Sequence, residues 1–349
     1  MTARSDTPVT VLLSMRRPNG TTQFVDLLLR GATPRVRYRF FSWRDALRGG
    51  YDVLHIHWPE LVVRDSRSRP LAFLKRRLME LLLLLLRLRR RPLVRTFHNP
   101  RPHEEGSGAE RRSLDRIDRR TDLFIALNRH TVPDGPAETV VIPHGDYADA
   151  FRDFDQPEAV RGRIAYFGII RPYKNVEALV TAFRGLDDPD LSLHIAGKPH
   201  AGQEERVRRA AEGDPRISLT LRLVDDAELV REVCEASLIV LPYREMRNSG
   251  ALLVAASLGR PCLVPDSEVN AELAAELGTE WVRTYAGVLT ERVVAEHLRD
   301  VEASGLLRGD GPDLSSRSAA AVGRLHEQAY VRAIEIVRGA DLTPEAVRT

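Results

Sequence analysis

The chain of 349 residues is poor in cysteine and lysine: it has two cysteines, and only three lysines against 49 arginines. Cys234 and Cys262 each lie inside an apolar run, which predicts packed thiols in a reducing compartment. Neither belongs to a spacing typical of metal ligands. The cysteine pattern therefore argues against a disulfide-stabilised secreted scaffold and against a cysteine-based metal site.

Long apolar runs and two common nucleotide-binding loops are also missing. The six leucines Leu81–Leu86 fall well short of the ~20 apolar residues that a membrane-spanning helix needs. The start, MTARSDTPVTVLLSM, has too short an apolar stretch and too early an acidic residue for a secretory signal. Neither G-x-G-x-x-G nor G-x-x-x-x-G-K-[ST] occurs, which argues against an NAD- or ATP-dependent enzyme. We expect a cytoplasmic protein.

Positive charge is concentrated around the stretch KRRLMELLLLLLRLRRRP. Arg64 to Arg91 carry a net charge of +8, whereas the whole chain carries +3, so the remainder is net negative. Good helix formers fill Leu71–Arg91 between Pro70 and Pro92, so we expect a helix there. Two interpretations stay open: Lys75–Arg91 lies peripherally on an anionic membrane surface, or it is a buried helix with charged ends. The arginines alternate with leucines, not aromatics, so we expect no nucleic-acid partner.

Short β-rich runs alternate with helical segments along the chain, the pattern of parallel α/β sheets. In the first half we expect strands at Val9–Ser14, Arg35–Ser42, Val53–His57, Leu93–His98 and Leu123–Leu127. In the second half we expect them at Ile164–Gly168, Leu191–Ala196, Ile217–Leu221, Leu238–Leu241, Cys262–Pro265 and Trp281–Thr284. Two such series predict two Rossmann-like domains, at 1–150 and 151–315. The last segment, 316–349, is expected to be a helix that crosses back to the first domain.

The loop after Ile164–Gly168 carries two cations in front of a helix. Gly168, Arg171 and Lys174 stand between the strand and the helix start, where backbone amides already favour an anion. A diphosphate fits such a position, and solvated loop cations are the alternative.

The segment LPYREMRNSGALLVAASLGRPCLVPD repeats the layout of strand, loop and helix. Asn248 or Ser249 suits a helix N-cap, and Gly250 lets a ligand approach the backbone closely. Glu245 can accept hydrogen bonds from sugar hydroxyls. Ordinary capping explains Asn248 and Ser249 equally well.

Loops of the first half offer further candidates. His98 follows a strand, and the loop Asn99–His103 after it is suited to contact a substrate; a structural histidine is the alternative. His55 and His57 face the same way on a strand, but no third metal ligand is apparent. The loop after the first strand offers a site for an acceptor phosphate or a plain turn, with the candidates Arg16, Arg17, Asn19 and Gly20.

These segments together carry a family resemblance. In the second half it rests on FGIIRPYKN, AGKP, DDAELVREVCEASLIVLPYRE and SGALLVAASLGRP, and in the first on DVLHIHWPE, TFHNPRPHE and IPHGDY. In this order and spacing they resemble nucleotide-sugar glycosyltransferases of the GT-B fold, in particular family four and its bacterial polysaccharide relatives. The resemblance covers nearly the whole chain.

The resemblance implies two Rossmann-like domains that face a central cleft, with a nucleotide sugar bound mainly by the second. Its diphosphate is expected between Lys174, Arg171 and the amides around Ser249 and Gly250. The sugar is expected near Glu245 and His98, the catalytic candidates. Cations and helix dipoles would stabilise the leaving nucleotide, so no metal or other cofactor is expected. Asn99 and His103 join Arg16, Arg17, Asn19 and Gly20 as expected acceptor contacts.

The chain departs from the family pattern at two places. Ile169 follows Gly168 where the family has an arginine, and the arginine comes later, as Arg171. The second glutamate of the family's usual pair corresponds to Val254, which cannot bind ribose hydroxyls. We expect a glycosyltransferase with a lipid-linked or polysaccharide acceptor, with GDP-mannose as the first guess for the donor and a UDP-sugar as the second. The alternatives are a soluble acceptor and a catalytically silent GT-B binding module.

Overall fold

The chain divides into two compact units in the computed structural model, which describes residues 7–15, 17, 24–98, 106–246 and 248–339. Unit 1 comprises residues 1–144 and 319–349, and unit 2 comprises residues 145–318. The expected division at 150/151 lies six residues further along the chain than the one between His144 and Gly145. Within the described residues each unit contains a parallel six-stranded sheet.

The sheet of unit 1 has the strand order β2-β1-β3-β4-β5-β6. Its strands are β1 (Val9–Leu13), β2 (Val36–Phe40), β3 (Val53–Ile56), β4 (Leu93–Phe97), β5 (Leu123–Ala126) and β6 (Glu138–Val141). The chain first moves from β1 to β2 on one side and then returns to β3 on the other side of β1. The strand order therefore switches between β1 and β3, where ligands bind in open α/β sheets.

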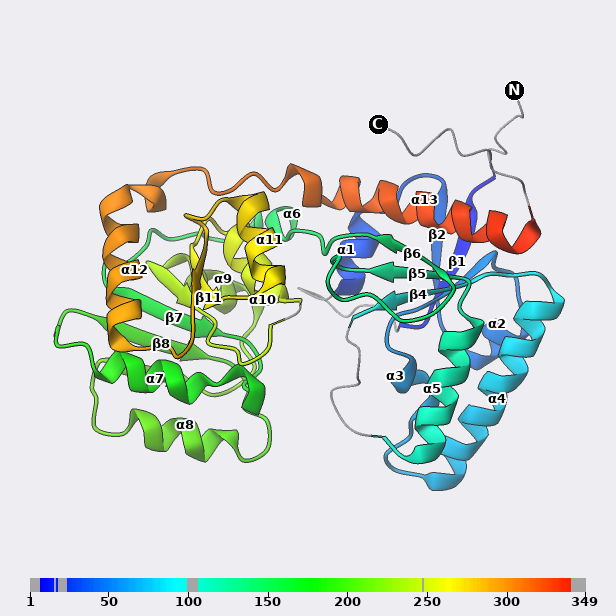
Figure 1. Ribbon diagram of the computed structural model, residues 1–349, viewed down its shortest axis with the longest axis horizontal. Coiled ribbons are helices and arrows are strands. Elements are labelled where there is room, and N and C mark those ends of the chain that lie inside the picture. Colours follow the sequence, from blue (N-terminus) through cyan, green and yellow to red (C-terminus); the bar gives the residue numbers. More distant parts are fainter. Residues whose placement is uncertain (1–6, 16, 18–23, 99–105, 247, 340–349) are drawn as a thin grey trace. The chain divides into compact units, whose positions relative to one another are not determined.

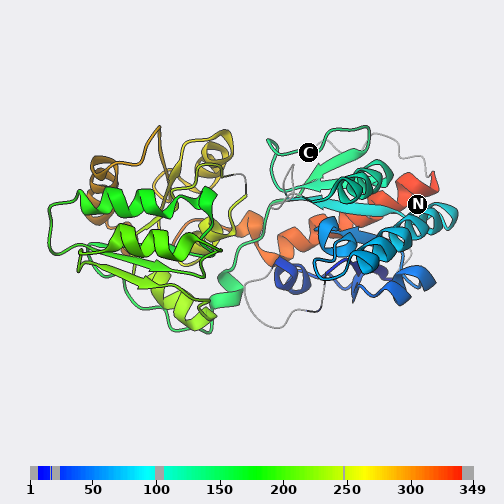
Figure 2. The ribbon, with the colours of Figure 1, turned by 90° about the horizontal axis from the view of Figure 1, so that it is seen from below.

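Helices cover both faces of this sheet in two layers (Figure 1). One face packs against α1 (Phe24–Arg30) and α13 (Ala319–Arg338), and the other lies over α2 (Trp43–Arg48), α3 (Pro59–Val63), α4 (Arg69–Leu88) and α5 (Gly108–Arg120). In Figure 2, α4 and α5 lie in front of the sheet and α13 behind it. Alternate strand residues supply the two cores: Val11 and Leu13 face α1 and α13, whereas Leu12 and Leu54 face α2–α5.

Unit 2 repeats the architecture with the order β12-β11-β10-β7-β8-β9. Its strands are β7 (Arg163–Phe167), β8 (Ser192–Ala196), β9 (Ile217–Thr220), β10 (Leu238–Val240), β11 (Cys262–Pro265) and β12 (Val282–Tyr285). Its helices are α6 (Ala148–Phe151), α7 (Val176–Arg184), α8 (Gln203–Ala211), α9 (Asp226–Cys234), α10 (Gly250–Ser257), α11 (Glu268–Leu277) and α12 (Glu291–Ser304), with 3-10 turns at Pro172–Lys174, Leu306–Arg308 and Ser315–Arg317. Here the order switches between β7 and β10.

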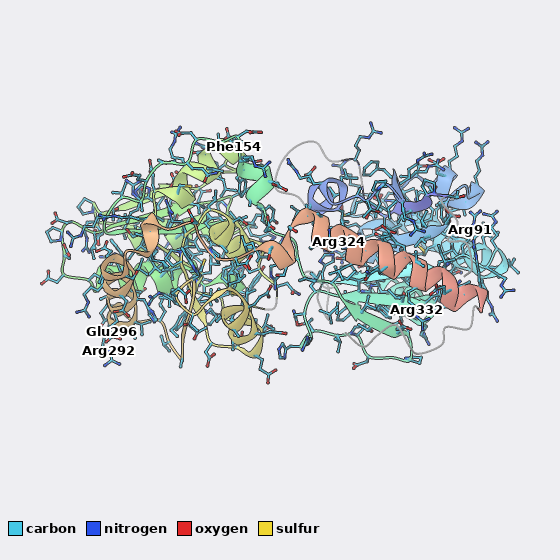
Figure 3. All side chains as sticks on the ribbon, turned by 90° about the horizontal axis from the view of Figure 1, so that it is seen from above. Arg91, Phe154, Arg292, Glu296, Arg324 and Arg332 are labelled. Carbon is cyan, nitrogen blue, oxygen red and sulfur yellow. The ribbon has the colours of Figure 1, made fainter. Side chains whose placement is uncertain are left out.

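The C-terminal helix α13 packs on unit 1, as expected for the end of the chain. Tyr330 is fully buried and reaches His55 of β3, while Arg332 pairs with Glu138 at 2.7 Å. Arg324 and Arg332 lie along this helix in Figure 3. Its first turns touch the end of α1 so closely that a Cβ on Gly323 would stand 1.6 Å from the carbonyl oxygen of Gly31. Backbone contact at glycine therefore fixes how α13 docks.

Helix α4 is apolar on two opposite faces: one is buried, as the interpretation as a core helix requires, and for the other the interpretation as a helix on a membrane surface stays a prediction. Its inner face is buried and consists of Ala72, Met79, Leu82, Leu83 and Leu86. Its outer face exposes Phe73, Leu74, Leu81, Leu84 and Leu88. Ser68 caps the helix by accepting a hydrogen bond from the Leu71 amide at 3.3 Å. Among the described residues, no helix is both long enough and apolar enough to span a bilayer.

We predict that Gly323→Ala lowers the free energy of unfolding by about 2 kcal/mol or more, because the new methyl group would collide with the Gly31 carbonyl. In an unconstrained helix the same change raises stability by up to about 1 kcal/mol. The measurement is urea unfolding followed by circular dichroism. Gly108→Ala at the start of α5 is the control, because its Cβ would meet only side-chain atoms at 3.6 Å or more. Equal stability of the two variants would refute the close docking of α13.

Candidate active site

The loops after β7 and β10 lie at the carboxyl ends of neighbouring strands in unit 2, where the strand order switches. Gly168 directly follows β7 and has φ +110°, a conformation that favours glycine. A Cβ at this position would stand 3.3 Å from Nζ of Lys174. The glycine thus leaves open space beside the lysine ammonium.

The Lys174 ammonium is the unusual charge of this candidate site in unit 2. It lies over the ring of Tyr243, with Nζ 5.0 Å from the centroid, and among the described residues no carboxylate pairs with it. Burial, reinforced by the charge of Arg171, lowers the pKa of Lys174 to about 8. A cation that is costly to bury and lies beside a second cation is suited to bind an anion.

Two hydrogen bonds from Arg244, in the loop after β10, hold the two loops together. The Arg244 amide donates to the Tyr173 carbonyl at 2.8 Å, and its guanidinium donates to Oδ1 of Asn175 at 3.3 Å. Asn175 takes a left-handed conformation at the start of α7. The structure therefore brings the 168–175 loop and the 241–250 loop to one place, as the diphosphate hypothesis requires.

The remaining second-half candidates lie along the β10–α10 loop. Ser249 is the N-cap of α10 and accepts a hydrogen bond from the Leu252 amide at 3.3 Å, with Gly250 as the first helical residue. Asn248 precedes the cap and is half-buried, whereas Glu245 is exposed. Val254 is buried within the helix, at the position where the family's second glutamate is expected.

In unit 1, a row of imidazoles lies on the α13 side of β3 and β4. His55 is fully buried and bonds through Nδ1 to the Tyr330 hydroxyl at 2.9 Å and through Nε2 to the Thr96 hydroxyl at 2.8 Å. His57 follows on the same face, and its ring centroid is 4.1 Å from that of His55. The alternation of side chains along the strand explains this pairing.

His98 lies at the edge of this row, immediately after β4. Its Nε2 is 3.3 Å from Nδ1 of His57, and its ring stacks on Trp58 at 4.3 Å with an interplanar angle of 13°. Phe24 contacts the rings of both histidines and of His144 at 5.1 to 5.2 Å. His98 is therefore held in orientation on several sides, and it is only half-buried.

Burial keeps the inner imidazoles neutral. Desolvation lowers the pKa values of His55 and His57 well below the ordinary value of 6.5, and that of His326 in α13 to about 4. Nδ1 of His326 donates to the Val322 carbonyl at 2.9 Å. No set of three or more His, Cys, Asp or Glu side chains suited to a metal ion occurs among the residues that the structure describes.

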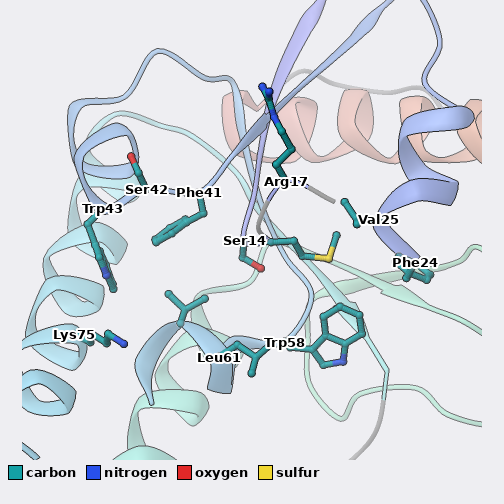
Figure 4. A pocket seen from close by; sticks show the side chains of 12 residues that line it. Ser14, Arg17, Phe24, Val25, Phe41, Ser42, Trp43, Trp58, Leu61 and Lys75 are labelled. Atoms are coloured by element: carbon teal, nitrogen blue, oxygen red, sulfur yellow. The ribbon is translucent and has the colours of Figure 1, made fainter. Parts of the chain in front are cut away.

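A pocket of about 960 Å³ opens in unit 1 at the carboxyl ends of β1, β2 and β3 (Figure 4). Its wall is mainly aromatic and aliphatic, with a few hydroxyl and cationic groups. The lining residues include Phe24, Phe41, Trp43, Trp58 and Leu61. Ser14, Ser42, Arg17 and Lys75 supply the polar part.

Arg17 is the one expected acceptor residue that the structure describes. It lines the pocket, with its guanidinium carbon 5.7 Å from the centroid of the Phe40 ring. The other five expected acceptor residues, Arg16, Asn19, Gly20, Asn99 and His103, lie outside the described residues. Their proposed contacts therefore stay predictions.

Sequence reasoning missed four residues that shape these sites: Tyr243, Arg244, Trp43 and Trp58. Tyr243 and Arg244 follow a predicted strand directly, so their position alone was a usable signal. Trp58 adjoins the His55–His57 pattern in the same way. Trp43 lies in the short helix α2, and no pattern in the sequence marked it.

Solved structures with the same overall fold include HepE from Anabaena with bound UDP-glucose, at 13% identity and a TM-score of 0.58, covering 95% of this chain and 98% of that one. Sucrose-phosphate synthase from Thermosynechococcus elongatus matches at 14% identity and a TM-score of 0.51, covering 95% and 87%. The two Rossmann-like units thus form a GT-B fold, which confirms the predicted fold class.

The family model described as glycosyl transferases group 1 matches residues 161–296, most of unit 2. Two curated relatives from Xanthomonas campestris are 44% and 43% identical over 329 residues, covering 93% of this chain and 93% of theirs. Both are called GDP-mannose:glycolipid 4-beta-D-mannosyltransferase. The chain belongs to the group 1 glycosyltransferases and is a glycosyltransferase, as its sequence predicted.

The neutral histidines give a prediction for stability against pH. The unfolded chain binds a proton on each imidazole near pH 6.5, but the folded chain binds it only at much lower pH, about 4 for His326. The unfolded state thus holds more protons in this window, so the free energy of unfolding falls as the pH drops below 6.5, and the histidine contribution is level between about pH 7 and 8.

Each of the three histidines contributes up to about 1.4 kcal/mol per pH unit to this slope. The measurement is urea unfolding of the wild type and of His326→Leu between pH 5 and 7. We expect the variant to lose about one third of the slope. Parallel curves for the two proteins would show that His326 is not held neutral in the fold.

Proposed function

We propose that this glycosyltransferase transfers mannose from GDP-mannose to the glycan of a glycolipid and forms a β-mannoside. Both curated relatives carry this donor, acceptor class and linkage in their names, at 44% and 43% identity over nearly the whole chain. Within this chain, the observation that carries the proposal is the Lys174 ammonium, which lies beside Arg171 with no carboxylate partner among the described residues.

The donor diphosphate is proposed to bind at this candidate site in unit 2. Lys174 and Arg171 supply positive charge, and Gly168 leaves room for phosphate oxygens. The first backbone amides of α10, after its N-cap Ser249, are proposed to donate hydrogen bonds to the diphosphate. Together they stabilise the charge that develops on the departing GDP, which is the main electrostatic requirement of the reaction. Glu245, in the loop between β10 and α10, is proposed to accept hydrogen bonds from the mannosyl hydroxyls.

GDP-mannose is an α-glycoside, so a β-mannoside product requires inversion at the anomeric carbon. In a single displacement, the acceptor hydroxyl oxygen bonds to C1 while the bond from C1 to the phosphate oxygen breaks and its electron pair leaves with GDP. The hydroxyl proton must pass to a base. His98 is proposed as that base: its Nδ1 takes the proton while its Nε2–H donates to Nδ1 of His57, which burial keeps neutral.

The outer face of α4 is proposed to hold the enzyme peripherally at the cytoplasmic membrane surface, where a glycolipid acceptor is presented. Phe73, Leu81 and Leu84 are about half exposed, which is unfavourable in water and suited to the headgroup boundary. Arg77 and Arg87 are exposed on the same helix and attract anionic lipids. This face and the buried one use different leucines, so one helix serves the core and the membrane.

We predict that GDP affinity depends on the protonation of Lys174. Because its pKa is about 8 in the free protein, affinity is level below pH 7.5 and falls above pH 8 by up to about tenfold per pH unit. Lys174→Ala weakens binding by about 10- to 100-fold at neutral pH and removes this dependence. Isothermal titration calorimetry with GDP measures both effects.

Arg208→Ala on α8 is the matched control, because it also removes one positive charge from unit 2 but an exposed one that pairs with Glu204. It should bind GDP like the wild type. Transfer of radiolabelled mannose from GDP-mannose into an organic-soluble glycolipid fraction tests the reaction itself, and His98→Ala should abolish it while GDP still binds. Unchanged GDP affinity in Lys174→Ala would remove the lysine from the donor site.

We predict that the double variant Leu81→Ser, Leu84→Ser loses about tenfold in binding to vesicles of mixed phosphatidylglycerol and phosphatidylcholine, with little change in melting temperature. Both leucines point outward and are exposed, so their loss opens no cavity. Vesicle sedimentation and a melting curve measure the two effects.

The paired control is Leu82→Ser, Leu86→Ser, which changes the same chemistry on the buried face of the same helix. This variant should melt at a markedly lower temperature. Vesicle binding of the wild type should also weaken when salt is added and when the vesicles contain phosphatidylcholine alone. An outer-face variant that sediments with vesicles like the wild type would exclude α4 as the membrane contact.

A further inference from the structure

Two of the chain's three tryptophans line the pocket of unit 1. Trp43 begins α2 and meets Phe41 edge to face, with ring centroids 5.1 Å apart. Trp58 follows β3 and meets Phe24 in the same manner at 6.3 Å. In Figure 4 the two indoles lie on opposite sides of the pocket, with Ser14 and Leu61 between them. The rings are thus fixed by aromatic neighbours before any ligand arrives.

The lining fits a flat amphipathic ligand better than a hydrocarbon chain. Ser14 accepts a hydrogen bond from the His57 amide at 3.1 Å, which leaves its hydroxyl proton for another acceptor. Lys75 donates to the Arg64 carbonyl at 3.1 Å and pairs with Asp65 at 3.0 Å, so its charge is compensated in place. A hydrocarbon chain in the pocket would displace water from these polar groups and could not replace the hydrogen bonds that the water makes. A pyranose ring presents C–H groups to the indoles and hydroxyls to the polar groups.

Trp58 connects the pocket to the proposed base. Its ring lines the pocket and also stacks on His98 at 4.3 Å, so a sugar against Trp58 lies one aromatic ring from that imidazole. The backbone amide of His57 is bound to Ser14 of the same pocket. The pocket wall and the histidine row are therefore one packed assembly.

We propose that Trp43 and Trp58 form a carbohydrate-binding subsite that stacks the sugar rings of the acceptor glycan and selects the acceptor. This inference rests on the proposed function, since it assigns the acceptor side of the same reaction. The volume of about 960 Å³ lies in the upper range for small-molecule sites and leaves room for more than one ring.

The experiment is a fluorescence titration of the full-length protein with octyl β-glucoside, octyl β-mannoside and octyl β-galactoside as probes. Tetraethylene glycol monooctyl ether, which has the same chain and no sugar, is the control for hydrocarbon binding. A sugar on the indoles should quench or shift the tryptophan emission in a saturable way. We expect at least one glycoside to do so and the ether not to.

The three tryptophans allow an internal control. The signal should be lost in a double Trp43→Phe, Trp58→Phe variant and kept in Trp281→Phe, because Trp281 is buried in unit 2 beside β12. In mannose transfer to the glycoside that binds most tightly, Trp43→Ala should raise the acceptor KM by about tenfold or more, because the variant loses the stacking of one sugar ring on the indole. Stabilisation by GDP shows that each variant is folded and that its donor site is intact.

The outcomes separate this inference from the proposed function. Equal binding of the ether and the glycosides would identify a lipid-chain pocket and overturn the subsite, and so would transfer with an unchanged acceptor KM in Trp43→Ala. A saturable sugar signal without any mannose transfer would keep the subsite and refute the proposed reaction. A wild type that transfers mannose but shows no saturable signal with any glycoside overturns the subsite alone.

Discussion

A cation held away from water without a carboxylate partner needs an anion, and Lys174 is such a cation. Its environment lowers its pKa to about 8, so the free protein holds it charged at a cost that the proposed diphosphate would remove. Its neighbours keep this ammonium in place and accessible: Gly168 has no side chain beside it, and the ring of Tyr243 lies against it. Arg244 connects the two loops around it by hydrogen bonds. The chemistry proposed for unit 2 follows from this charge, which has no carboxylate partner among the described residues.

Both units place their candidate sites by the same rule of topology. In each sheet the chain leaves the first strand on one side and returns on the other, and the loops diverge at that point. Unit 2 puts cations and a helix start there, which suits phosphate. Unit 1 puts aromatic rings and a row of neutral imidazoles there, which suits a sugar and a proton transfer. One scaffold thus produces a candidate site in each unit, and the two sites differ in their loop chemistry.

Much of the fold could be predicted from sequence, because buried parallel strands and long helices leave strong periodic patterns. Strand β11 was predicted with its observed bounds, Cys262–Pro265. The short helices α2 and α3 were not predicted, because five or six residues hold too little periodicity. The proposed donor residues could be picked out from their place between strand and helix, and their role stays a prediction. Trp43 was not, since only the folding of α2 against β1 and β3 makes it part of a pocket.

Helix α4 shows a different limit of sequence. A run of six leucines satisfies an inward and an outward face at once, so its pattern favours neither, and only packing separates Leu82 and Leu86 from Leu81 and Leu84. The sequence left burial and membrane contact open because the same helix has one buried and one exposed apolar face.

The most direct test of the central claim is the melting temperature of the purified protein with GDP-mannose, GDP, UDP, ADP and dTDP, since a ligand that binds only the native state must raise it. The account predicts a selective rise with GDP and GDP-mannose that disappears in Lys174→Ala. No rise with any nucleotide, or an equal rise in Lys174→Ala, would contradict a donor site built around this lysine.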